Sequence, residues 1–139
     1  MNKNIPSTLL EFDPRFISYE NFYQYDYNFP LNLPCHLEGK FDVIIVDPPF
    51  LSEECLTKIC VTVKWLSAKT SESKIILCTG QWFFHCKIKT YIVTGKVQEE
   101  LAYKLLNVKP CEKFEPKHES RLSNEFGCFV NFDPVSLNK

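Results

Sequence analysis

Residues 41–50, Phe41-Asp42-Val43-Ile44-Ile45-Val46-Asp47-Pro48-Pro49-Phe50, decide the fold class of this chain. Four consecutive β-branched residues, Val43 to Val46, come without polar alternation, which is typical of a strand buried on both faces, as in a parallel sheet covered by helices. The two prolines that follow cannot continue the strand in a sheet interior. This pattern predicts the α/β class, with a turn at the carboxyl end of a central strand.

The segments on either side continue an alternation of strands and helices. Before the central strand, residues 9–13 read as the end of a short strand and residues 21–25 as another. After it, the pattern predicts a helix over 53–66 capped by Ser52, a buried strand over 74–78, a helix over 97–107, and two strands over 111–116 and 126–132 joined by a polar loop. The sequence therefore predicts one α/β sheet, mainly parallel, with a C-terminal antiparallel pair that reverses one edge.

Length and charge narrow the class of protein. The 139 residues suffice for one domain and not for two of ordinary size. Sixteen basic residues against seventeen acidic ones give a net charge of -1, so no whole-domain electrostatic attraction to a polyanion is expected. The first eight residues lack the apolar run of a signal peptide, and the longest apolar run is too short to span a bilayer. We therefore expect a soluble, cytoplasmic protein.

The seven cysteines include no CxxC pair, and the three histidines lie far apart in the sequence. Reduced cysteines that behave as small hydrophobic residues are favoured over a metal site or a disulfide framework. No metal site is predicted.

The tetrapeptide Asp47-Pro48-Pro49-Phe50 follows the central strand directly, where open α/β sheets gather their ligands. The Asp47 carboxylate and the Pro48 carbonyl can accept hydrogen bonds from an amine and aim its lone pair at an electrophilic methyl group. The prolines fix φ and hold these acceptors in place, while Phe50 offers an apolar face to the amine. The alternative is a proline-stiffened turn with Asp47 as a helix cap, but the context of strand and capped helix favours an amine methyltransferase.

Several motifs together resemble the sequence pattern of one protein family. Residues 41–56, Tyr25-Asp26-Tyr27-Asn28, Leu77-Cys78-Thr79-Gly80 and Ser123-Asn124-Glu125-Phe126 stand in the order of one known family. Over about residues 10–133 the chain resembles the elongation factor 1-alpha lysine methyltransferase 1 family, DPPF/Y-type proteins once described as adenine-specific DNA methyltransferases. The resemblance implies a Rossmann-like class I fold, S-adenosyl-L-methionine as cofactor, and protein-lysine N-methylation of translation elongation factor 1-alpha.

The resemblance also implies roles for individual residues. Asp47, Pro48, Pro49 and Phe50 would hold the target lysine amine. Glu11 or Asp13, at the end of the first strand, would bind the ribose hydroxyls of the cofactor. Asp26 would recognise the adenine amine, with Tyr25 or Tyr27 near the ring. Without the family, a turn-forming Asp26 and aromatic residues that pack in the core are the simpler readings.

Two segments depart from the family pattern. The earlier strand and glycine-containing loop that cradle the methionine end of the cofactor are not found, since no glycine precedes Gly39, so we expect residues 1–139 to form a single, partial domain. The aromatic and basic segment 81–95 repeats the Thr79-Gly80 pair at its end, and its removal would join a strand to a helix normally. We predict that 81–95 is an insertion, with a functional substrate-binding loop as the alternative.

Three functions are consistent with these features. The leading one is protein-lysine methylation by direct attack of a neutral amine. The second is methylation of the exocyclic amine of adenine in nucleic acid, which the near-neutral charge disfavours. The third is a non-catalytic, truncated product that binds no cofactor and at most associates with the elongation factor.

Overall fold

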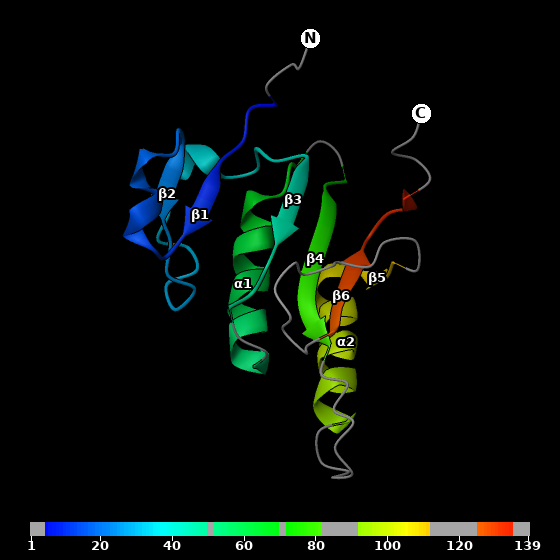
Figure 1. The fold of residues 1–139 in the computed structure, drawn as a ribbon. Helices are drawn as coiled ribbons and strands as arrows, with labels where there is room; N and C mark the ends of the chain where they lie inside the picture. Colours follow the sequence, from blue (N-terminus) through cyan, green and yellow to red (C-terminus); the bar gives the residue numbers. More distant parts are fainter. Residues whose placement is uncertain (1–4, 50–51, 70–71, 82–91, 112–124, 135–139) are drawn as a thin grey trace.

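The computed structural model describes residues 5–49, 52–69, 72–81, 92–111 and 125–134 (Figure 1). Strands and helices alternate along these residues, as the α/β class requires. In chain order they are β1 (Leu9–Glu11), the 3-10 helix η1 (Pro14–Ser18), β2 (Phe22–Gln24), the 3-10 helix η2 (Cys35–Leu37), β3 (Val43–Val46), α1 (Glu53–Leu66), β4 (Lys74–Gln81), α2 (Ile92–Leu106), β5 (Lys109–Pro110) and β6 (Glu125–Val130).

The larger sheet has the strand order β3-β4-β6-β5. Strands β3 and β4 pair in parallel, whereas β6 runs antiparallel to both of its neighbours. The α/β class is confirmed, but β6 pairs with a strand at Lys109–Pro110, before the strand predicted over 111–116, and only one of the three pairings described in this sheet is parallel. The predicted reversed edge is wrong, because the reversed strand β6 lies inside the sheet and the short strand β5 forms the edge. The sheet is therefore mixed, and residues 112–116 of the strand predicted over 111–116 lie outside the described residues.

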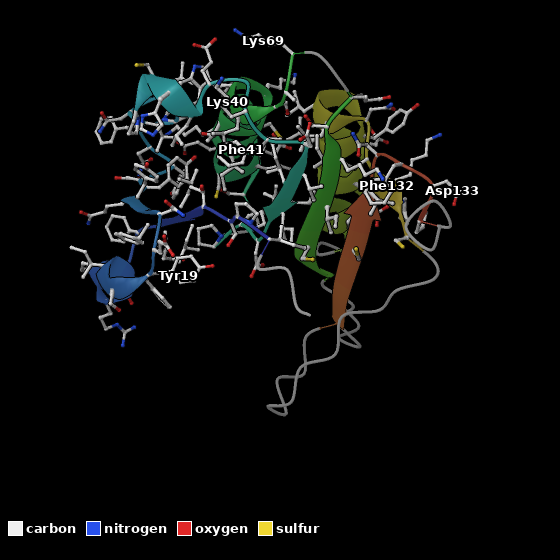
Figure 2. The ribbon with its side chains drawn as sticks, turned by 90° about the horizontal axis from the view of Figure 1, so that it is seen from above. Tyr19, Lys40, Phe41, Lys69, Phe132 and Asp133 are labelled. Carbon is white, nitrogen blue, oxygen red and sulfur yellow. The ribbon has the colours of Figure 1, made fainter. Side chains whose placement is uncertain are left out.

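Strand β3 is buried on one face only, which corrects the prediction of a strand buried on both faces. Ile44 and Val46 are buried, but Val43 retains 52% and Ile45 retains 71% of its exposed surface. The physical reason is the placement of the helices: α1 and α2 pack against each other and lie on the same face of the sheet (Figures 1 and 2). A run of β-branched residues predicts a strand, but it does not report how many of its faces are covered.

Helix α1 has the bounds that the sequence predicts. The Ser52 side chain accepts a hydrogen bond from the Cys55 backbone N–H at 3.2 Å and so caps the helix, with Glu53 and Glu54 in its first turn. The alternative of Asp47 as the cap is therefore wrong. The apolar face of α1 is buried against the sheet, and its members are Cys55, Leu56, Ile59, Cys60, Val63 and Leu66.

Helix α2 begins at Ile92, earlier than the predicted start at Val97, and ends at Leu106. The next residue, Asn107, adopts a φ of 54°, and its N–H donates to the Tyr103 carbonyl at 2.8 Å. An asparagine in the left-handed region is a common way to end a helix. The chain then turns back through Val108, which is fully buried, into β5.

The segment 81–95, predicted to be an insertion, is described only at its ends. Gln81 is the last residue of β4, and Ile92 to Gly95 belong to the backbone of α2. Residues 82–91 lie outside the described residues. The insertion therefore stays a prediction.

Strands β1 and β2 form a second, two-stranded parallel sheet, which confirms both short strands predicted near the start of the chain. In Figure 2 this small sheet, with Tyr19 beside it, lies at the opposite end of the molecule from Phe132, which follows β6. Of the aromatic residues in this part, Tyr23 and Tyr27 pack against the core, whereas Phe16 and Tyr19 are exposed. Core packing thus explains only part of the aromatic cluster.

A polar network closes the end of the large sheet where β4 begins. The Asn131 side chain accepts a hydrogen bond from the Ile75 N–H at 2.7 Å and donates to the Ser73 carbonyl at 2.8 Å. The buried Ser73 hydroxyl donates to the Phe41 carbonyl and accepts from the Ala68 N–H, both at 2.8 Å. These bonds satisfy backbone groups where β3, β4 and the residue after β6 meet.

Candidate functional site

A cavity of about 530 Å³ lies between the small sheet, strand β3 and helix α1. Its apolar lining comes mainly from β3 and α1. Its polar residues come from the ends of strands, from the segment after β2 and, in the case of Thr62, from α1. The lining residues used below are Glu11, Tyr25, Asp26, Tyr27, Asn28, Asp47, Pro49 and Thr62. The volume and mixed lining are those of an ordinary small-molecule site.

Three carboxylates reach this cavity from separate parts of the sequence. Glu11 ends β1, Asp26 follows β2, and Asp47 follows β3. No lysine, arginine or histidine is among the described residues that line the cavity. The cavity therefore has a negative electrostatic character that favours a cationic ligand.

The structure separates the two candidates for the ribose contact. Glu11 lines the cavity, while its Oε1 accepts a hydrogen bond from the Asp13 N–H at 3.0 Å. Asp13 instead caps the 3-10 helix η1, accepting hydrogen bonds from the backbone N–H and the guanidinium of Arg15. These hydrogen bonds hold the pKa of Asp13 below its usual value. Asp13 is thus engaged outside the cavity, and Glu11 is the carboxylate that faces it.

Asp26 forms a turn and also lines the cavity. Its Oδ1 accepts a hydrogen bond from the Asn28 N–H at 2.8 Å, so the residue does form a turn, and it also lines the cavity beside Tyr27. A carboxylate has further lone pairs beyond those used in the turn. Asp26 can therefore accept a hydrogen bond from a bound ligand while it shapes its own segment.

Helix α1 holds the segment that carries Asp26. The Lys58 ammonium donates to Asn28 Oδ1 at 3.0 Å and lies 5.8 Å from the centre of the Tyr27 ring. The same ammonium pairs with Glu54 one turn earlier, and this pair raises the pKa of Lys58. Lys58 thus acts at the outer edge of the segment, with its charge balanced by a carboxylate.

A second contact from α1 is more deeply buried. The Tyr25 hydroxyl lies 2.7 Å from Thr62 Oγ1, and the Thr62 hydroxyl donates to the Pro30 carbonyl at 2.7 Å. Because Thr62 has a single hydroxyl proton, Tyr25 must be the donor in their shared bond. Burial raises the pKa of Tyr25, and the bond with Thr62 opposes that rise. Neither Thr62 nor Lys58 was singled out from the sequence, although a threonine within the apolar face of α1 is a signal of a buried polar contact.

The segment Asp47-Pro48-Pro49 lies at the carboxyl end of β3. Asp47 and Pro49 line the cavity, Pro48 is half-buried between them, and Phe50 lies outside the described residues. Asp47 is exposed and near the neighbouring strand β4, where its charge adds to the effect of burial in raising the pKa of Cys78. Its carboxylate is therefore open to an incoming group.

The six described cysteines are free thiols, and Cys55, Cys60 and Cys128 are buried. Within the described ranges, no group of three potential metal ligands comes together. No helix among the described residues is long and apolar enough to cross a membrane.

Two sheets whose acidic residues gather around one cavity form an α/β domain with a cavity of the size and lining that small-molecule sites have. The family model described as "Probable N6-adenine methyltransferase" matches residues 1–134. The chain therefore belongs to this methyltransferase family.

Relatives with known names extend this finding. The chain is 48% identical over 126 residues to EEF1A lysine methyltransferase 1 of Gallus gallus, which covers 89% of this chain and 50% of that protein. It is 45% identical over 136 residues to the Danio rerio protein of the same name, covering 96% of this chain and 70% of that protein. Protein-lysine N-methyltransferase EFM5 of Saccharomyces cerevisiae is 38% identical over 128 residues, covering 90% of this chain and 49% of that protein. The chain spans about half the length of most of these relatives, and no solved structure matches it.

Proposed function

We propose that this chain is part of a protein-lysine N-methyltransferase that uses S-adenosyl-L-methionine and acts on translation elongation factor 1-alpha in the cytoplasm. The observation that carries the proposal is the cavity lined by Glu11, Asp26 and Asp47, with no basic side chain among its described lining residues. The parallel β3–β4 pair with helices on one face supports a Rossmann-like class I fold, and the names of the relatives support the substrate.

The lining of the cavity fits the proposed cofactor. Glu11, at the end of β1, is the residue that would accept hydrogen bonds from the ribose hydroxyls. Asp26 would accept one from the adenine amine, with the Tyr27 ring and the apolar lining beside the base. When bound, the cofactor supplies a methyl group on a positively charged sulfur. The carboxylates around the cavity would stabilise that charge.

Asp47, Pro48 and Pro49 would position the acceptor. A lysine amine must lose its proton before it attacks, and the Asp47 carboxylate with the Pro48 carbonyl can hold the two N–H groups of the neutral amine. The lone pair of the amine would then point at the methyl group that the bound cofactor supplies, and the same acceptors would remain in contact with the remaining N–H groups of the product. Because the prolines restrict the backbone, this arrangement needs little reorganisation.

Adenine in nucleic acid is the second candidate acceptor, and the description of the family model favours it. A nucleic-acid strand would bring phosphates to a cavity lined by three carboxylates, which is unfavourable. The lysine amine, cationic when it arrives, suits the same cavity. The choice is tested by offering elongation factor 1-alpha, DNA and RNA to the chain, each with methyl-labelled cofactor. Label in the protein supports lysine as the acceptor. Label confined to nucleic acid contradicts it.

We further propose that residues 81–95 are an insertion within a single, partial domain. Their removal would join Gly80, in β4, to Lys96, in the backbone of α2. A variant that lacks them should keep the helix content and the unfolding midpoint of the full chain. A variant that fails to fold would contradict the insertion, and a folded variant that no longer methylates elongation factor 1-alpha would support the substrate-loop alternative.

A further inference from the structure

We infer that Thr62 of helix α1 is a positioning residue, which sets the segment 25–30 against the cavity so that Asp26 and Tyr27 meet the adenine end of the cofactor. This inference rests on the proposed function. Thr62 also lines the cavity, and the inference assigns its effect to its hydrogen bonds with Tyr25 and Pro30.

The contact between Thr62 and the segment 25–30 is buried, and the donor and acceptor of each hydrogen bond are determined. Thr62 retains only 3% of its exposed surface. It accepts a hydrogen bond from the Tyr25 hydroxyl and donates to the Pro30 carbonyl, so one side chain bonds to two points of the same segment. A buried hydroxyl with both bonds satisfied fixes the geometry more tightly than apolar packing, because leaving either partner unpaired is costly.

The two bonded points bracket the residues that line the cavity. Asp26, Tyr27 and Asn28 lie between Tyr25 and Pro30, and their own turn does not attach them to the rest of the domain. The other contact from α1, the bond from Lys58 to Asn28, is exposed to solvent and is correspondingly weaker. Thr62 therefore supplies a buried, hydrogen-bonded attachment of this segment to α1.

Helix α1 also begins directly after the acceptor motif, since Ser52 caps it. The same rigid helix thus follows Asp47 to Pro49 at its start and holds the segment with Asp26 at its middle. Through Thr62, the segment with Asp26 is therefore bonded to the helix that follows Asp47 to Pro49 in the chain. A small displacement of a ligand from its reacting partner can reduce a rate strongly.

The test compares three variants of the full chain by calorimetric titration with S-adenosylhomocysteine. Thr62→Val removes both hydrogen bonds of the hydroxyl and should weaken binding about tenfold. Thr62→Ser keeps the hydroxyl and should bind like the unchanged protein. Thr57→Val makes the same chemical change at an exposed position of the same helix and should also bind normally. Binding by Thr62→Val as tight as that of the unchanged protein would overturn the inference.

Hydrogen exchange of the amides of residues 26–32 provides a second measurement that needs no ligand. Thr62→Val should speed this exchange, and Tyr25→Phe should speed it without adding to the effect of Thr62→Val in the double variant. Unchanged exchange in Thr62→Val would contradict the attachment. If the folded, unchanged chain does not bind S-adenosylhomocysteine, the proposed function fails, whereas the exchange still decides whether Thr62 holds the segment.

Discussion

The carboxylates of Glu11 and Asp47 line one cavity although their strands belong to different sheets. Glu11 is the last residue of β1, and Asp47 is the first residue after β3. The carboxyl ends of the two strands therefore meet at the same site, as in α/β proteins that bind their ligands at strand ends. Under the proposed function, Glu11 would contact the cofactor and Asp47 would contact the acceptor amine.

Replacement of Asp47 by Asn should separate chemistry from cofactor binding. We expect methyl transfer to fall by roughly 100-fold or more, because the carboxylate that holds the neutral amine is lost. The dissociation constant for S-adenosylhomocysteine and the stability should change little, since Asp47 is exposed. Glu20→Gln, which alters an exposed carboxylate outside the cavity, is the matched control. Full activity of Asp47→Asn would remove this residue from the mechanism.

Glu11 and Asp13 offer a direct contrast. Glu11→Gln should weaken the binding of S-adenosylhomocysteine by roughly tenfold or more, because charge-assisted hydrogen bonds to the ribose are lost. Asp13→Asn should leave binding nearly unchanged, since Asp13 bonds to Arg15 and not to the cavity. Calorimetric titration of both variants checks this. The reverse order of effects would return the ribose contact to Asp13.

The Asn131 side chain should matter for stability alone. Asn131→Ala would leave the Ile75 N–H and the Ser73 carbonyl without their partner, and we expect the free energy of unfolding to fall by about 1–3 kcal/mol. Asn32→Ala, at an exposed position, should change it by less than about 0.5 kcal/mol. Urea denaturation of both variants measures the difference, and equal stabilities would show that the network contributes little.

Buried thiols should make the protein less stable at alkaline pH. Burial raises the pKa of Cys60 to about 11 and is the main cause of the same value for Cys128. Unfolded thiols have a pKa of about 8.5, so below that pH the thiols are protonated in both states and stability is unaffected. Between about pH 8.5 and 11 only the unfolded thiols ionise, and stability falls by at most about 1.4 kcal/mol per pH unit for each thiol.

Urea denaturation between pH 8 and 9.5 measures the slope of the free energy of unfolding against pH, below the range in which tyrosines ionise. Cys60→Ala should flatten the slope, whereas Cys35→Ser should not, because Cys35 is exposed. A slope that is unchanged in Cys60→Ala would contradict the assignment to buried thiols.

Local patterns in the sequence predicted the elements that local chemistry determines. Ser52 with Glu53 and Glu54 marked the start of α1, and the spacing of apolar residues gave its buried face. The position of Asp47 after β3 also followed from the sequence, because a strand that ends in two prolines leaves little choice. The assignment of the chain to its methyltransferase family rested on several short motifs, and the family match confirms it.

The features that depend on contacts between distant segments could not be predicted in this way. Strand β3 is covered on one face because both helices pack on that face. The residues of β3 alone do not show where the helices pack. The choice between Glu11 and Asp13 depended on the hydrogen bonds of Arg15 to Asp13. Thr62 gained its role only when the chain brought Tyr25 and Pro30 to α1, 37 and 32 residues away in the sequence.

Titration of the purified, monodisperse chain with S-adenosylhomocysteine tests the central claim most directly. The acidic cavity between β1 and β3 predicts binding at one site per chain, weakened by Glu11→Gln and unaffected by Asp13→Asn. A folded sample that binds no S-adenosylhomocysteine would contradict the proposed cofactor site and leave this chain with the family's acceptor motif alone.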